Sequence, residues 1–403
     1  MPETRGPGGV RATPGWLPLY GGFLITGVVT VLLGPLLPDL AREWRLPVEE
    51  LRALFVVQFL ASAVGSFLSS YRLGLSLGLG YLLIAAGLVS LSLAGWPVAL
   101  APMAAVGFGL GLAIPATNLG VAHAQPQRRG AALSSLNMVW GAGAVACPLL
   151  FAVRPAGMSS DAVLLVLAGA AGLVLTCLAW NARPAAAGRF TLGAPASSPA
   201  SEENAPQGGG QGGVLRGLVV IAAIMFLYVG IENSVGGWLV SLADQFQAGR
   251  SATSLWIGSG FWAALLASRA AAPLVLRRMS EPTLYTAGVV LAGGGLLGLL
   301  LSGSQAGLAV AAVAAGAGLA PLFPLTISFL ADLTAATRSR NTGWVFALAG
   351  AGGAVLPWLT GRLAGGADGL AAGFVAPIGG LVLLALLFGL LRRLSAPVQP
   401  QTA

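Results

Sequence analysis

Long apolar segments recur along this chain of 403 residues, and each is about 20 residues long. A helix rises about 1.5 Å per residue, so one such segment crosses the hydrocarbon core of a bilayer. Charged residues make up only 8% of the sequence, against about 25% in an ordinary soluble protein. The segments lie near residues 17–39, 51–71, 73–94, 97–122, 131–153, 160–181, 215–243, 252–275, 283–302, 306–331, 341–363 and 370–391. The sequence therefore predicts an all-α membrane protein with twelve transmembrane helices.

A polar gap divides these segments into two sets of six. Residues 182–213 are rich in Ala, Pro, Ser and Gly and end in "QGGGQGG", a composition typical of a flexible linker. We therefore expect an N-terminal six-helix bundle (residues 1–181), a cytoplasmic linker (182–213) and a C-terminal six-helix bundle (214–403).

The two sets resemble one another at one constant offset. "GFGL" (Gly107–Leu110) then coincides with "GAGL" (Gly316–Leu319). The same offset pairs Pro115 with Pro324, Thr117 with Thr326, and Arg129 with Arg338. Parallel halves related in this way are an architecture of secondary transporters, whose binding site lies near the midplane between the halves.

The net charge of +8 is carried by arginines, which lie mostly in the connectors. If the N-terminus is cytoplasmic, fifteen arginines, Arg269 among them, fall on the cytoplasmic side and six on the other. This asymmetry predicts that both termini are cytoplasmic. It also explains the positive charge without a nucleic-acid partner.

The residues that would support catalysis or metal binding are missing from the pattern. Cys147 and Cys177 both lie in apolar runs, and neither belongs to a spacing that would bind a metal. No paired acids and no nucleophile–base set stand out. We expect no enzyme activity, no cofactor and no metal.

Several stretches resemble the major facilitator superfamily, and within it the fucose–galactose–glucose:proton symporter branch. They are "LLGPLLPDLAREW" (Leu32–Trp44), "GLGLAIPATN" (Gly109–Asn118), "YVGIENSVGGWL" (Tyr228–Leu239), "APLFPLTISFLAD" (Ala320–Asp332) and "GAGGAVLPWLTG" (Gly350–Gly361). The resemblance implies a monomeric carrier of the bacterial inner membrane that works by alternating access. Proton-coupled members of that branch carry acids in helices 1 and 4. This chain has none in the middle of its first segment, and it has Ile114 at the position in the fourth.

Glu232 is the only acidic residue well inside a predicted helix. A charge at mid-bilayer costs about 2.5–3.5 kcal/mol on insertion scales. Glu232 is therefore expected to bind substrate or carry a proton, unless it only bonds a neighbouring helix. Tyr228, four residues earlier, shares its face, and Asn233 follows about 100° around the helix.

Other polar and aromatic residues inside the segments are further candidates for substrate contacts. Each also has a plain structural alternative, because amides join helices and prolines bend them. The substrate-binding candidates are Asn118, Asn137, Gln58, Trp140, Trp262, Trp344 and Thr326. The candidates for gating are Pro115, Pro324, Arg129 and Arg338.

Two functions fit these residues. The first is transport of a small neutral solute, a monosaccharide by preference, with Glu232 as the proton-coupling candidate or with no coupling at all. The alternative is a proton-coupled exporter of drugs or secondary metabolites. Both need a small-molecule substrate and a lipid bilayer as partners, and both can involve protons.

Overall fold

The computed structural model describes residues 16–69, 73–124, 129–155, 157–186, 211–246, 252–337, 343–364 and 369–395. Regular structure in these ranges is entirely helical. In chain order the elements are α1 (Trp16–Thr30), α2 (Leu33–Trp44), the 3₁₀ helix η1 (Val48–Arg52), α3 (Ala53–Leu68), α4 (Leu73–Leu91), α5 (Leu100–Ala124), α6 (Arg129–Ala152), α7 (Ser160–Ala186), α8 (Gln211–Asp244), α9 (Ala252–Val275), α10 (Glu281–Leu301), α11 (Gln305–Leu319), α12 (Leu322–Thr337), α13 (Gly343–Leu363), α14 (Gly369–Ala372) and α15 (Val375–Ser395).

All twelve predicted segments are helical, although some are broken. Ten helical stretches are long and apolar enough to cross a membrane, and α1 with α2 forms an eleventh span that bends by 48°. The twelfth segment is α9, which has 24 residues and includes Arg269. The predicted class, an all-α membrane protein, is confirmed.

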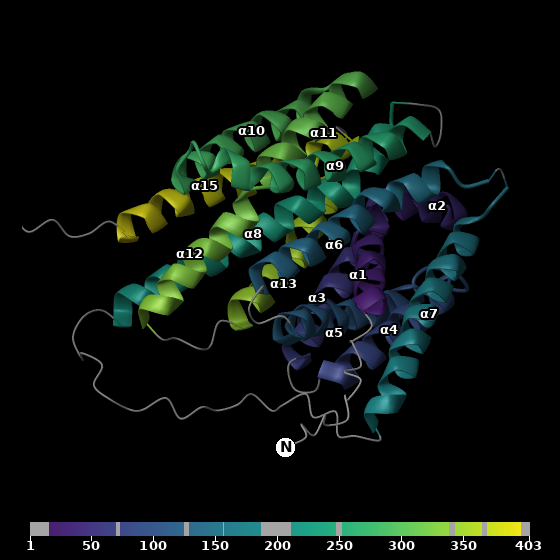
Figure 1. Ribbon diagram of the computed structural model, residues 1–403. Coiled ribbons are helices and arrows are strands. Elements are labelled where there is room, and N and C mark those ends of the chain that lie inside the picture. The colour runs from purple at the N-terminus through teal and green to yellow at the C-terminus, as the bar shows by residue number, and fades with distance from the viewer. Residues whose placement is uncertain are drawn as a thin grey trace, which may run out of the picture.

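The helices form two groups (Figure 1). Helices α1–α7 pack mainly with one another, and so do α8–α15. The main contacts across the groups join α2 with α8, α3 with α13, and α6 with α9. Helices α7 and α8 extend into the predicted linker from both ends, to Ala186 and from Gln211. Residues 187–210 lie outside the described part of the chain.

The internal repeat has a packing basis. A Cβ atom at Gly107 of α5 would collide with the carbonyl of Gln58 on α3, and one at Gly316 of α11 with the carbonyl of Phe261 on α9. These two glycines coincide in the sequence repeat. In both halves they allow two helix backbones to touch, as small residues do in membrane proteins.

The break between α1 and α2 is held by side chains from other helices. Gln58 of α3 is buried and donates from Nε2 to the carbonyl of Thr30 at 3.1 Å. On α2, Asp39 accepts hydrogen bonds from Arg154 at 3.1 Å and from Ser160 at 2.6 Å. These bonds fix the far end of the first span.

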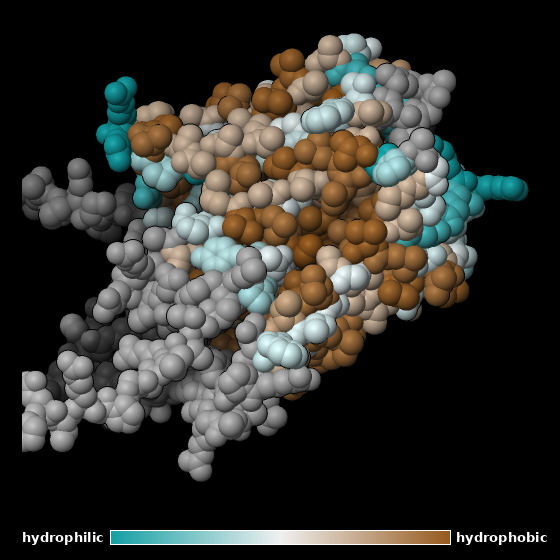
Figure 2. All heavy atoms as spheres, turned by 45° about the vertical axis from the view of Figure 1, so that its right-hand side comes forward, coloured by the Kyte–Doolittle hydropathy of each residue, from teal (hydrophilic) through white to brown (hydrophobic). Residues whose placement is uncertain are grey.

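The surface suits lipid. Large apolar side chains lie more than 60% exposed on several helices, among them Leu75, Leu173, Val290 and Leu386. Figure 2 shows apolar residues across the middle of one face, with hydrophilic residues toward its ends. Such a surface would be unfavourable in water and is expected in hydrocarbon.

Candidate functional site

Glu232 lies within α8 and forms an ion pair with Arg269 of α9. Arg269 Nη2 lies 2.9 Å from Glu232 Oε2, and the two side chains are 23% and 11% exposed. The hydroxyl of Tyr228 donates to the same carboxylate oxygen. Arg269 Nη2 in turn donates to the Tyr228 oxygen at 2.6 Å. We call these three residues the Tyr–Glu–Arg cluster.

Helical spacing builds the cluster from two elements. Tyr228 and Glu232 are four residues apart on α8, so both side chains leave the same face. On α9, Trp262 and Arg269 are seven residues apart, or about two turns, and also share a face. Because α8 packs against α9, these two faces meet.

Pro324 explains how Arg269 is held on its other side. In a regular helix the carbonyl of Ala320 would accept from the N–H of residue 324, but proline has none. Arg269 Nε donates to this carbonyl at 3.3 Å instead. The guanidinium also lies 5.8 Å from the ring centre of Phe323, which is within the range of a cation–π contact.

Arg269, which was counted with the cytoplasmic arginines, is not a connector residue. It lies inside α9, six residues before the helix ends at Val275, and its charge compensates Glu232. The spacing between Arg269 and the next arginines already indicated that Arg269 lies inside the helix. Arg277 and Arg278 already mark the end of the helix, so Arg269 falls about two turns inside it.

The cluster keeps groups that a ligand could use. Within the described residues, no hydrogen bond reaches Oε1 of Glu232 or Nη1 of Arg269. The first is an acceptor and the second carries two N–H donors. The cluster can therefore bind a solute that offers a donor and an acceptor side by side.

Two tryptophans lie next to the cluster. A Cβ atom at Gly236, one turn after Glu232, would collide with the indole of Trp262, so glycine at this position lets the ring lie against α8. Trp140 of α6 meets Trp262 edge to face, with ring centres 6.2 Å apart. Since α6 belongs to the first group of helices, this pair joins the two halves.

The three asparagines predicted to bind substrate form hydrogen bonds within their own helices. Asn118, Asn137 and Asn233 each donate from Nδ2 to the carbonyl four residues earlier in their own helix, at 2.8–2.9 Å. Asn137 is exposed, and the other two are half-buried. Each keeps its amide oxygen for another partner, but no described hydrogen bond joins them to the cluster.

Three predicted residues are placed in helix packing. Gln58 holds the α1–α2 break. The hydroxyl of Thr326 donates to the carbonyl of Leu322 at 2.7 Å and can accept from the hydroxyl of Tyr285 on α10, 3.5 Å away. Trp344 is half-buried near the start of α13 and packs on the core. The structure does not bring these three side chains to the cluster.

The gating candidates are only partly described. Pro115 lies inside α5, and Pro324 lies in α12, where it frees the carbonyl of Ala320. Arg129 begins α6, but its side chain is not described, and Arg338 lies outside the described residues. Their predicted role at a gate stays a prediction.

Comparisons with known proteins give matches only through structure. No family model and no curated protein sequence matches this chain. Among solved structures, it is similar to the E. coli fucose:proton symporter FucP in its outward conformation, with 16% identity over 96% of this chain and 99% of FucP and a TM-score of 0.59.

Two inward or ligand-bound neighbours superimpose better. A bacterial homologue of the human lysosomal transporter Spinster, inward-facing, has 12% identity over 97% of this chain and all of that chain, with a TM-score of 0.69. The peptide transporter POT bound to alafosfalin has 17% identity over 96% of both chains, with a TM-score of 0.74. The chain therefore has the fold of major facilitator superfamily transporters.

Proposed function

We propose that this protein is a transporter that moves a small polar solute without net charge, preferably a monosaccharide, across the bacterial inner membrane. The observation that carries the proposal is the Tyr–Glu–Arg cluster beside the Trp140–Trp262 pair. It combines a donor, an acceptor and aromatic surface near the middle of the fold, where transporters of this architecture bind substrate.

The charges of the cluster favour a neutral solute. Glu232 and Arg269 neutralise one another at 2.9 Å, so a strongly ionic ligand would find no unmatched counter-charge. A vicinal diol matches the remaining groups, because one hydroxyl can accept from Arg269 Nη1 while its neighbour donates to Glu232 Oε1. The indoles of Trp140 and Trp262 offer apolar surface to the C–H face of a sugar ring.

Glu232 is also the group that we propose for proton coupling. Protonation would remove its negative charge and weaken its bond to Arg269, which would then favour a hydroxyl oxygen of the substrate as acceptor. Binding of substrate and of a proton would thereby support each other, which is the requirement for symport.

Alternating access is supported by where the halves touch. Their contacts concentrate toward the ends of the helices away from the linker, as between Phe55 and Trp238, whose rings lie 5.4 Å apart. If the termini and the linker are cytoplasmic, as the arginine asymmetry predicts, this arrangement is closed on the outside.

Ligand-induced thermal stabilisation tests the substrate class. The purified protein is heated with a panel of monosaccharides, with charged sugar acids and with lipophilic cations. Stabilisation by neutral sugars that is lost in Trp262→Ala supports the proposal. Stabilisation by lipophilic cations alone would instead favour the drug exporter.

Counterflow in proteoliposomes tests the coupling. We expect Glu232→Gln to retain sugar exchange but to lose accumulation driven by a pH gradient. Accumulation that stays as sensitive to the pH gradient as in the unmodified protein would remove Glu232 from the coupling mechanism without affecting the substrate class.

A further inference from the structure

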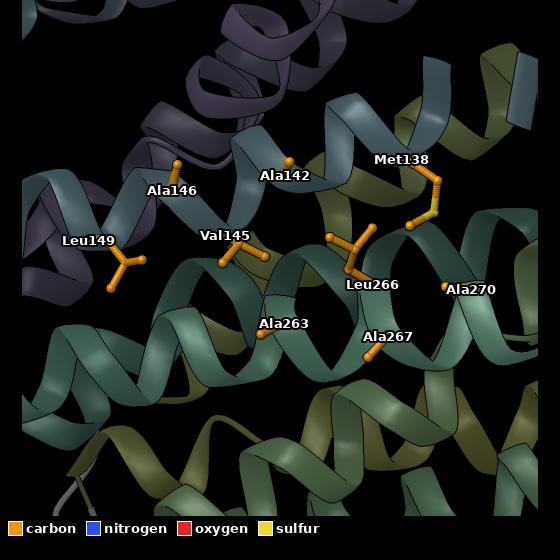
Figure 3. Close-up of a pocket in the computed structure, with 9 residues that line it drawn as sticks. All are labelled: Met138, Ala142, Val145, Ala146, Leu149, Ala263, Leu266, Ala267 and Ala270. Carbon is orange, nitrogen blue, oxygen red and sulfur yellow. The ribbon is translucent and has the colours of Figure 1, made fainter. Parts of the chain in front are cut away.

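An apolar groove runs between α6 and α9, along the seam between the two halves. Its volume is about 460 Å³. Figure 3 shows side chains of both helices around this space. The nine lining residues are all apolar, and five of them are alanines, which leave the groove room: Met138, Ala142, Val145, Ala146, Leu149, Ala263, Leu266, Ala267 and Ala270.

The groove opens toward the lipid and away from the Tyr–Glu–Arg cluster. On α9, Ala263 and Ala267 follow Trp256 by seven and eleven residues, so the three share a helix face. Trp256 is 56% exposed. Trp262 and Arg269 leave α9 on the face that meets α8. Leu266 borders both surfaces, because it follows Trp262 by four residues and precedes Arg269 by three, and from it the groove extends toward the side of Trp256, away from the cluster.

The chemistry of the walls selects the occupant. Water gains no hydrogen bonds from apolar side chains, and an ion would lose its hydration without replacement. An empty groove would forfeit the dispersion contacts of its walls. Because α6 contains a membrane-spanning stretch, hydrocarbon chains surround the groove at high concentration. We propose that an acyl chain of a membrane phospholipid occupies the groove between α6 and α9.

Such a chain would bind one arrangement of the halves in preference to others. The two helices touch directly where Ser259 donates to the carbonyl of Val145 at 3.1 Å and where Leu266 lies against Gly141. The acyl chain fills the remainder of the seam. Since α6 and α9 belong to different halves, any rocking of the halves changes the groove, so the lipid acts as a ligand of this conformation.

Photo-crosslinking tests the site directly. The full chain is reconstituted in phosphatidylethanolamine–phosphatidylglycerol vesicles that contain a phospholipid with a diazirine in its acyl chain. After irradiation, we expect the label in the peptides that contain Met138–Leu149 and Ala263–Ala270. Filling the groove with the double substitution Ala142→Leu and Ala267→Leu should abolish this label and leave the label around exposed Val290 of α10 unchanged.

A matched control and a second readout keep the test decisive. Ala287→Leu adds the same side chain on exposed α10, and it should leave the groove label intact. Added phospholipid should raise the melting temperatures of the unmodified protein and of Ala287→Leu. It should raise the melting temperature of the double groove variant by less. If the double variant does not fold, the single variant Ala263→Leu takes its place in this comparison. Equal labelling in the filled and unmodified proteins, or a groove label no stronger than that at Val290, would overturn the proposal.

Discussion

Gly34 of α2 and Gly236 of α8 bring two backbones into contact across the halves. A Cβ atom at Gly34 would collide with the carbonyl oxygen of Gly236. At the neighbouring Gly237, a Cβ atom would collide with the side-chain ring of Phe55. This contact lies one turn beyond Glu232 on α8, so the place where the two halves touch and the candidate site share one helix.

Gly34→Ala should therefore separate the halves at this end. The obstacle is a backbone carbonyl, which cannot rotate away as a side chain can. Spin labels at exposed Arg45 and Phe246 would report a longer distance between α2 and α8 in this variant. Gly21→Ala is the control, because a Cβ atom there meets nothing within 4 Å. An unchanged distance distribution in Gly34→Ala would refute the contact as the closure.

Breaking the ion pair on one side should cost stability, and removing both charges should restore part of it. Glu232→Gln or Arg269→Gln alone leaves a mostly buried charge without its partner, at a cost of about 3–5 kcal/mol. In Glu232→Gln with Arg269→Gln, no such charge remains. Thermal unfolding in detergent compares the three variants. A double variant no more stable than the weaker single variant would contradict the pairing.

Pro324→Ala should disturb Arg269 without touching it. Alanine supplies the N–H that proline lacks, and this N–H competes for the carbonyl of Ala320 that now accepts from Arg269. We expect reduced sugar-induced stabilisation while the helix itself is no less stable. Pro115→Ala, the equivalent change in the first half, is the control. An identical effect of both changes on sugar binding would argue for a general effect of helix straightening.

Gly236→Ala should weaken sugar binding by displacing the Trp262 indole, which occupies the position of the added methyl group. The measurement is the sugar concentration that gives half-maximal stabilisation, which we expect to rise. Gly294→Ala on α10 is the matched control, because its Cβ atom would meet nothing within 4 Å. If the two alanine variants bind sugar equally well, Trp262 does not depend on Gly236.

Much of the architecture follows from local sequence. Segment length and hydropathy fix the number and position of the helices, because a bilayer admits only chains whose backbone groups are satisfied internally. The repeat pairs Gly107 with Gly316, and the structure shows that both allow close contact between two helices. The breaks within two of the segments, after Thr30 and after Leu319, could not be predicted in this way, because the hydropathy of the sequence does not change at either position.

Glu232 could be singled out from sequence alone, because an acid amid apolar residues is costly. Its partner could not, since Arg269 lies 37 residues further along the chain and sequence distance does not report which helix faces meet. The same limit explains Gln58 and Thr326, whose polar groups are used in packing between helices. The sequence therefore determined a membrane bundle with one unusual carboxylate. Only the tertiary structure decided that this carboxylate is neutralised, because charge compensation depends on proximity in space.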